Sequence, residues 1–291
     1  MGINLHHDAG STRLIGDDGR MHSPDSDVAT TVAPESDDTR DDTPHPHFGR
    51  RVTSFRARRS TISDGQQATW DRLWPELGKQ VRTGDDPAGL LDTDAWFGRH
   101  APVVLEIGCG TGTSTLAMAQ AEPDIDVVAV EVYRRGLAQL LSAIDRASET
   151  SPATNIRLLR GDGVDVLTHM FGPGALTGVR VFFPDPWPKA RHHKRRLLQT
   201  ETMALIADRL RPGGVLHVAT DHQEYAGHIA EVGDAEPRLR RVRVDGDDTD
   251  TADAANTPVR PPISTARPVT KYEKKALAGT DVAELLWEKA P

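Results

Sequence analysis

A chain of 291 residues is long enough for one large domain with a buried core of ordinary size. Its apolar runs fall far short of the roughly 20 residues that a bilayer span needs, and its N-terminus lacks the basic and apolar blocks of a secretory signal. The single cysteine, Cys109, excludes an internal disulfide and a zinc site built from several thiols. These features predict a cytoplasmic protein without a membrane anchor.

The formal net charge of −8 is unevenly distributed along the chain. Residues 1–49 contain ten Asp or Glu and three Arg, and residues 245–257 contain five Asp with no Lys or Arg, so the rest of the chain is mildly basic. The local charge sets the potential that a polyanion meets, so nucleic acid is not excluded as a partner. We expect a disordered acidic tail at 1–49 and one domain at 50–291, interrupted by an acidic loop near 245–260.

The expected elements begin with a basic arm at 50–59, whose five arginines fit a solvated flank as well as a phosphate contact. A packed helix should follow near residues 70–77, where apolar side chains recur at helical spacing. From Pro102 onward, β-branched runs alternate with helical patterns, which is typical of an α/β domain with a mainly parallel sheet. Strands are expected near 103–107, 127–131, 156–160, 179–183, 215–219 and 282–287. Helices are expected at 134–147 and 195–210, the second ended by Gly213-Gly214.

The first expected strand runs into a glycine-rich turn in the stretch LEIGCGTG. Gly108, Gly110 and Gly112 would let a ligand approach the backbone beside the positive end of the following helix. The spacing is G-x-G-x-G, whereas dinucleotide sites have G-x-G-x-x-G and this chain has Thr113 at the last glycine position. The turn therefore favours a ligand without a pyrophosphate and disfavours a dinucleotide oxidoreductase.

Acidic residues lie at the ends of three successive expected strands. Glu106 is inside the end of the first, Glu131 closes the second 23 positions after Gly108, and Asp162 follows the third. Each alone would more often be a helix cap or a surface charge. Because the carboxyl ends of parallel strands meet at one crevice, the three together predict a nucleoside site, with Glu131 toward the ribose and Asp162 toward the adenine.

The segment VRVFFPDPWPKARHHKRRLL joins a buried strand to a proline-flanked acid and a basic run. Pro184 and Pro186 impose a stiff, extended exit that would hold Asp185 at the mouth of the crevice. An aromatic residue, Trp187, and cations beside a nucleoside site favour an RNA substrate. The alternatives without a functional role are that Asp185 caps a turn, that Trp187 packs in the core, and that the basic run is the solvated start of a helix. The cations are Lys189, Arg191, Lys194, Arg195 and Arg196.

His192 and His193 lie within the basic run, but no carboxylate or cysteine stands beside them at ligand spacing. We therefore predict no metal site.

The stretch FFPDPWPKARHHKRR, with LEIGCGTG, ATDHQEYA and RPVTKYE, resembles the motifs of the bacterial tRNA (guanine-N7)-methyltransferase family. The resemblance covers about residues 50–291, apart from the acidic insertion. It implies a Rossmann-like class I methyltransferase fold, with a mainly parallel seven-stranded sheet and helices on both faces. It also implies transfer of a methyl group from S-adenosylmethionine to N7 of a guanine in tRNA, at position 46 of the variable loop.

The resemblance assigns roles to individual residues. Asp185 would be the catalytic residue, and the glycines of the turn would line the methyl donor. Contacts to S-adenosylmethionine or to the reacting centre would come from Glu106, Glu131, Asp162 and Asp185. The target nucleotide would be bound by Lys189, Asp221, Thr270, Lys271, Tyr272 and Glu273. The tRNA would be contacted by Arg191, Lys194, Arg195 and Arg196. No obligate protein partner is implied, and the chain would act as a monomer or a homodimer.

Guanine N7 already carries an in-plane lone pair, so attack on a sulfonium methyl group needs no prior deprotonation. We therefore expect Asp185 to orient the reactants rather than to remove a proton. A small-molecule methyltransferase would have no use for the basic run. An RNA-binding module without activity would not be stabilised by S-adenosylmethionine.

Overall fold

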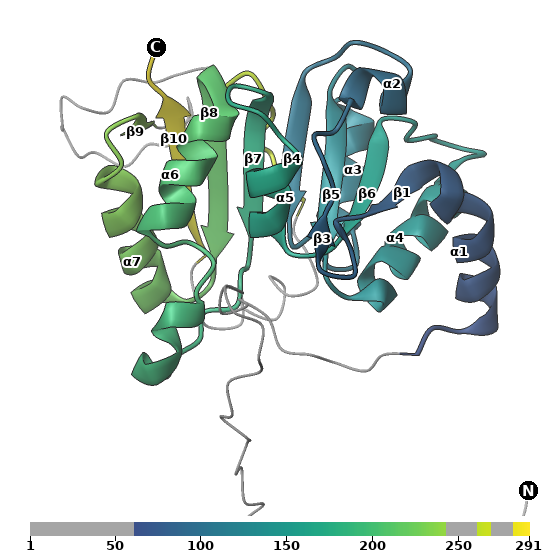
Figure 1. Cartoon of the computed structure of the whole chain (residues 1–291), viewed down its shortest axis with the longest axis horizontal. Coiled ribbons are helices and arrows are strands. Elements are labelled where there is room, and N and C mark those ends of the chain that lie inside the picture. Colours follow the sequence, from purple (N-terminus) through teal and green to yellow (C-terminus); the bar gives the residue numbers. More distant parts are fainter. Residues whose placement is uncertain (1–60, 243–260, 269–281) are drawn as a thin grey trace, which may run out of the picture. The chain divides into compact units, whose positions relative to one another are not determined.

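The computed structural model describes residues 61–242, 261–268 and 282–291 (Figure 1). The acidic tail expected at 1–49, the basic arm at 50–59 and the acidic insertion near 245–260 lie outside the described residues, so these assignments remain predictions.

The helices of the described residues alternate with strands in chain order, as expected for an α/β domain. They are α1 (Asp64–Leu77), α2 (Thr93–Phe97), α3 (Thr113–Ala121), α4 (Arg134–Ala147), α5 (Gly163–His169), the 3-10 helix η1 (Ala190–Arg195), α6 (Thr200–Arg209) and α7 (Gln223–Asp234). The strands are β1 (Gly78–Gln80), β2 (Arg82–Thr83), β3 (Asp86–Pro87), β4 (Val103–Ile107), β5 (Asp126–Glu131), β6 (Ile156–Arg160), β7 (Leu176–Phe182), β8 (Leu210–Thr220), β9 (Leu239–Arg241) and β10 (Ala283–Lys289).

The main sheet of the described residues has eight strands in the order β1-β6-β5-β4-β7-β8-β10-β9. All neighbours are parallel except β10, which runs antiparallel to both β8 and β9. The expected mainly parallel sheet is confirmed, but the expected count of seven strands is wrong. β1 and β9 have three residues each. A strand of that length contains too little alternation to stand out in a sequence.

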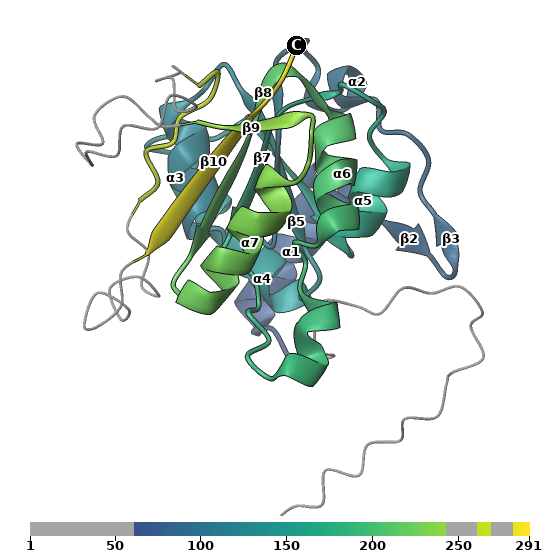
Figure 2. The same ribbon diagram turned by 90° about the vertical axis from the view of Figure 1, so that its left-hand side faces the viewer.

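Helices cover both faces of the sheet, as expected (Figure 2). On one face, α5, α6 and α7 pack against alternate side chains of the central strands. On the other face, α1, α3 and α4 bury the remaining side chains of β5 and β6. Every residue of β4 and β5 is buried. This two-sided burial explains why these strands read as continuous apolar runs rather than as alternating patterns.

The aromatic residues of the first helix are core residues, as expected. Trp70 is buried and stacks on Trp74 with a centroid distance of 4.1 Å. The guanidinium of Arg134, at the start of α4, lies 4.8 Å from the Trp70 ring centroid. Ser63 begins α1 with a capping box that it shares with Gln66, so the start of the helix is encoded locally.

Gly213 and Gly214 were expected to end a helix, but they lie inside β8. α6 already ends at Arg209, and it begins at Thr200, so the basic residues before it form η1 instead. Gly213 has a φ of 72°. A Cβ on Gly214 would lie 2.8 Å from the carbonyl oxygen of Arg211. The pair therefore allows a tight backbone turn at the beginning of the strand.

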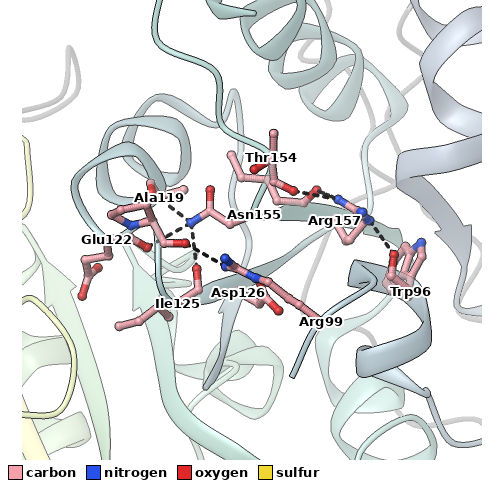
Figure 3. A network of polar contacts seen from close by, with 11 residues as sticks. Trp96, Arg99, Ala119, Glu122, Ile125, Asp126, Thr154, Asn155 and Arg157 are labelled. Atoms are coloured by element: carbon pink, nitrogen blue, oxygen red, sulfur yellow. Dashed lines mark hydrogen bonds and ion pairs between the residues drawn. The ribbon is translucent and has the colours of Figure 1, made fainter. Parts of the chain in front are cut away.

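Polar contacts fix the amino-terminal ends of β5 and β6 (Figure 3). The buried amide of Asn155 donates to the carbonyl oxygens of Ala119, Glu122 and Ile125. Arg99 donates to Asp126, the first residue of β5. These bonds satisfy backbone carbonyl groups of the connection between α3 and β5, at the amino-terminal end of the parallel strands.

Candidate active site

The carboxyl ends of β6, β5, β4, β7 and β8 lie along one edge of the sheet, because these neighbouring strands are parallel (Figure 1). The glycine turn follows β4, Glu131 ends β5, and Asp162 follows β6. Asp185 follows β7, and Asp221 follows β8. The strand order therefore brings these predicted site residues to a common edge.

The glycine turn is built to leave room above its backbone. Gly108, Gly110 and Gly112 have φ values of 79°, 56° and 75°. A Cβ at Gly108 or Gly110 would meet no atom within 4 Å, whereas one at Gly112 would lie 2.4 Å from Leu140 Cδ1. Gly108 and Gly110 thus face open space that suits a ligand, and Gly112 is required for packing against α4.

Glu131 holds this turn in place. Its Oε2 accepts a hydrogen bond of 2.9 Å from the Gly110 amide, and its Oε1 accepts one of 2.9 Å from the Tyr133 amide. Burial raises the pKa of Glu131, and the two amide bonds oppose that rise. Each carboxylate oxygen can accept a further bond, so a contact to ribose hydroxyls remains compatible with this geometry. The bracing of the turn is a role that the sequence did not reveal.

Glu106 lies within β4, beside Arg180 of β7 in the sheet register. It is 3% exposed, and its Oε2 has no hydrogen-bond partner among the described residues. Burial raises the pKa of Glu106, and the charge of Arg180 opposes the rise. Arg180 itself is paired with Glu122 at 2.6 Å. Glu106 is therefore a buried acid two residues before the turn, and its contact to the methyl donor stays a prediction.

Substituting Glu106 with Gln should change how stability depends on pH. A raised pKa means that the folded protein holds this proton to higher pH than the unfolded chain does, so the stability contributed by the group is lost as pH rises through the raised value. Gln cannot ionise. As pH rises above about 4 and through the raised pKa of Glu106, the Tm of Glu106→Gln should therefore rise relative to that of the unsubstituted protein, by roughly 2–4 °C per kcal/mol. Parallel melting curves of the two proteins without ligand would measure this, and a constant difference would contradict it.

Asp162 begins α5 and serves as its N-cap. Its Oδ1 accepts a hydrogen bond of 2.9 Å from the Val164 amide. The alternative that Asp162 is a helix cap therefore describes part of its role. A carboxylate oxygen can accept more than one hydrogen bond, so a contact to an adenine amine is compatible with this cap, and that role stays a prediction.

The turn after β7 is conformationally unusual. Among the described residues, Phe183 and Trp187 are the two non-glycine residues with positive φ, at 51° and 45°. They flank Pro184-Asp185-Pro186, and Asp185 between the prolines is exposed. Such conformations cost of order 1–3 kcal/mol each and gather at functional sites. The strain supports the expectation that Asp185 is held at a defined position.

Trp187 is 5% exposed, so it packs rather than offering a free stacking face. The guanidinium of Arg195 lies 5.2 Å from its ring centroid, and the His192 ring lies edge-on at 5.7 Å. The tryptophan is therefore the core around which η1 folds. Trp187 is therefore better described as a packed core residue than as a surface on which RNA bases could stack.

The five cations of the basic run do not share one environment. Lys189, Arg191 and Lys194 are exposed, and Arg195 is half-buried against Trp187. Together these four residues form what we call the cationic ridge. Arg196 is only 2% exposed and is bound to Glu224 and to the Pro186 carbonyl oxygen. The expectation that Arg196 contacts tRNA must therefore be corrected, because the side chain is buried and each of its guanidinium nitrogens donates to a protein group.

Asp221 is exposed directly after β8, whereas Thr270, Lys271, Tyr272 and Glu273 lie outside the described residues. Arg267, shortly before them, is a functional candidate that the sequence did not suggest. Its guanidinium lies 5.1 Å from the Phe183 ring centroid, and Arg267 pairs with Glu284 at 2.7 Å. Arg267 thus lies beside the strained turn.

Among the described residues, no group of three or more His, Cys, Asp or Glu side chains could hold a metal ion. None of the helices in those same ranges has the length and apolar character needed to span a bilayer.

The parallel sheet, the open glycine turn and the acids at the strand ends define an α/β methyltransferase with a Rossmann-like fold that uses S-adenosylmethionine. A family model described as "Putative methyltransferase" matches residues 100–284. A protein of Mycolicibacterium gilvum (strain PYR-GCK) named tRNA (guanine-N(7)-)-methyltransferase is 76% identical over 278 residues, which cover 95% of this chain and 100% of the relative. A protein of the same name from Mycobacterium tuberculosis (strain ATCC 25177 / H37Ra) is 62% identical, covering 86% and 90% of the two chains. The chain belongs to the tRNA (guanine-N(7)-)-methyltransferase family.

Among solved structures, the aminoglycoside resistance methyltransferase NpmB1 superposes with a TM-score of 0.44 at 14% identity, over 71% of this chain and 97% of that one.

Proposed function

We propose that this protein transfers the methyl group of S-adenosylmethionine to N7 of a guanine in tRNA. The observation that carries the proposal is the placement of an open glycine turn, a strained acidic turn and an exposed cationic ridge at adjoining strand ends. Relatives at 76% and 62% identity carry the name of this activity.

The residues at the site fit the methyl donor. Gly108 and Gly110 leave open space over the turn, and the oxygens of Glu131 and Asp162 keep acceptor capacity for ribose hydroxyls and for an adenine amine. When bound, S-adenosylmethionine supplies an electrophilic methyl group on a sulfonium. Glu106, Glu131, Asp162 and Asp185 are the residues that we assign to this ligand.

The protein's own contribution is placement. The N7 lone pair lies in the plane of guanine, so no base is needed, and alignment of N7 with the methyl group can lower the barrier by several kcal/mol. Asp185, fixed between Phe183 and Trp187, would accept hydrogen bonds from N1 and N2 of guanine or from amino groups of the donor. Lys189, Asp221 and residues 270–273 would complete the pocket for the target nucleotide.

The finer assignments rest on the family resemblance. The target would be the guanine at position 46 in the variable loop, and the shape of the folded tRNA would present it. The catalytic domain would span residues 50–291 and act in the cytoplasm without an obligate protein partner, as a monomer or a homodimer.

The proposed function is tested by the chemistry of its product. The protein is incubated with labelled S-adenosylmethionine and unmodified tRNA, and the RNA is then reduced mildly and treated with aniline. Reduction and aniline break the chain at 7-methylguanosine, so one specific cleavage that requires both protein and donor is expected. Incorporated label without cleavage would contradict methylation at N7.

The cationic ridge gives a second prediction. If Arg191 and Lys194 neutralise phosphates, Arg191→Ala and Lys194→Ala should each flatten the plot of log affinity against log salt concentration by about one unit. Filter binding of tRNA at several salt concentrations would measure the slopes. Arg211→Ala is the control, because Arg211 is exposed at the amino-terminal end of β8, outside the cationic ridge. It should leave the slope unchanged. An unchanged slope in both ridge variants would refute the assignment.

A further inference from the structure

We propose that Arg196 is a positioning residue that holds the Asp185 turn in its strained conformation and does not contact tRNA. The inference deepens the proposed function, because it assigns a role in methyl transfer to a member of the basic run. It rests on contacts that link the turn after β7 to helix α7.

All three nitrogens of the Arg196 guanidinium donate to protein groups. Its Nε donates to the carbonyl oxygen of Pro186 at 2.9 Å. Its Nη1 donates to Glu224 Oε1 at 3.1 Å, and its Nη2 donates to Glu224 Oε2, which makes the pair bidentate. The side chain of Arg196 is 1% exposed, whereas that of Glu224 is 56% exposed. Solvent therefore reaches the acid of this pair, whereas the arginine is closed to solvent and to RNA phosphates.

Tyr225 forms the platform beneath Arg196. The guanidinium lies 4.8 Å from the Tyr225 ring centroid, and the ring is completely buried. The Tyr225 hydroxyl oxygen accepts a hydrogen bond of 3.2 Å from the Leu198 amide. Burial raises the pKa of Tyr225 to about 12, so the phenol stays neutral under ordinary conditions. The Arg196 guanidinium thus lies against α7 on one side and donates to the turn after β7.

The bond to Pro186 places the effect of Arg196 next to Asp185. Pro186 follows Asp185 directly and precedes Trp187, one of the two strained residues. A strained conformation persists only where surrounding contacts hold it. The bond from Arg196 to the Pro186 carbonyl oxygen is such a contact on the carboxyl side of the acid. Loss of this bond should let the turn relax and move the Asp185 carboxylate.

The geometry requires arginine rather than any cation. One planar group donates in three directions and also lies over a ring, which the point charge of lysine cannot reproduce. Arg196→Lys keeps the net charge and should therefore leave tRNA affinity and its salt slope unchanged. It should lower kcat by about 10-fold or more, because small misplacements at a reacting centre cost that much. Single-turnover methyl transfer at saturating tRNA and donor would measure the loss.

Arg211→Lys is the matched control outside the basic run, because Arg211 is exposed at the amino-terminal end of β8. It makes the same change of residue type and should leave tRNA binding, the salt slope and kcat unchanged. Glu224→Gln is a milder second variant that weakens the pair while leaving Arg196 present, and it should lower kcat in the same direction by less. Melting curves with and without S-adenosylmethionine establish that each variant is folded and still binds the donor.

A readout independent of activity separates this inference from the proposed function. Hydrogen exchange of the peptide that spans residues 183–196, which contains the hydrogen-bonded amides of His192 and Arg196, should be faster in Arg196→Lys than in the unsubstituted protein, and unchanged in Arg211→Lys. Exchange unaltered in Arg196→Lys, or a flattened salt slope with normal kcat, would overturn the role of Arg196. An unsubstituted protein that forms no 7-methylguanosine would instead overturn the proposed function.

Discussion

Replacing Asp185 with alanine is expected to lower the rate of methyl transfer to tRNA by about 10²-fold or more while leaving the Kd for tRNA unchanged. The reason is that Asp185 is exposed in the turn after β7, between two residues with strained backbone conformations. Its carboxylate is therefore held in position by the backbone and is not buried in the core. Its loss removes alignment of the reactants but none of the cations that bind phosphates. Single-turnover kinetics and filter binding on the same preparations would measure the two effects.

Asp124 provides the control for this substitution. It is an exposed acid in the loop before β5, at the opposite end of the sheet, so Asp124→Ala changes the net charge equally. That variant should have normal kinetics. If Asp185→Ala weakened tRNA binding as much as it slowed methyl transfer, Asp185 would be a binding residue and the orienting role would be wrong.

The second large effect is expected at Gly110. Gly110→Ala should weaken S-adenosylmethionine binding by about 1–3 kcal/mol, or roughly 5- to 150-fold, because the new methyl group would enter the open space over the turn. Calorimetric titration with the donor would measure the loss.

Gly98→Ala is the matched control for backbone strain. Gly98 has a φ of 73° against 56° for Gly110, and a Cβ at either position meets no protein atom within 4 Å. Gly98 follows α2, away from the strand ends that carry the site. Both variants should melt slightly lower, but only Gly110→Ala should lose donor affinity. Equal donor affinity in the two variants would remove the glycine turn from the binding site.

The parts of the site that the sequence predicted are those encoded by local pattern and by the rule that parallel strands end together. The glycine turn, the strands that contain Glu106 and Glu131, and the strand that precedes Asp185 follow from β-branched runs and spacing. The sheet order then brings them to one edge. The placement was therefore predictable, although the sequence could not show that Glu131 also braces Gly110.

What could not be predicted depends on partners far apart in the chain. Arg195 and Arg196 are neighbours in one basic run, yet one lies on Trp187 and the other is buried against Glu224, 28 positions later. Arg267 reaches Phe183 from the C-terminal segment in the same way. No local pattern distinguishes an arginine that meets phosphate from one that meets a distant carboxylate. Short edge strands such as β1 are missed for a related reason, since only pairing with β6 defines them.

The most direct test of the account replaces the acceptor atom itself. A tRNA transcribed with 7-deazaguanosine carries a C–H group where N7 would be, so it has no lone pair to attack a sulfonium methyl group. This RNA should accept no label from S-adenosylmethionine, yet it should compete with unmodified tRNA for binding to the protein. Label transfer to the 7-deaza RNA at the normal rate would contradict the account, because the methyl group would then be going to an atom other than guanine N7.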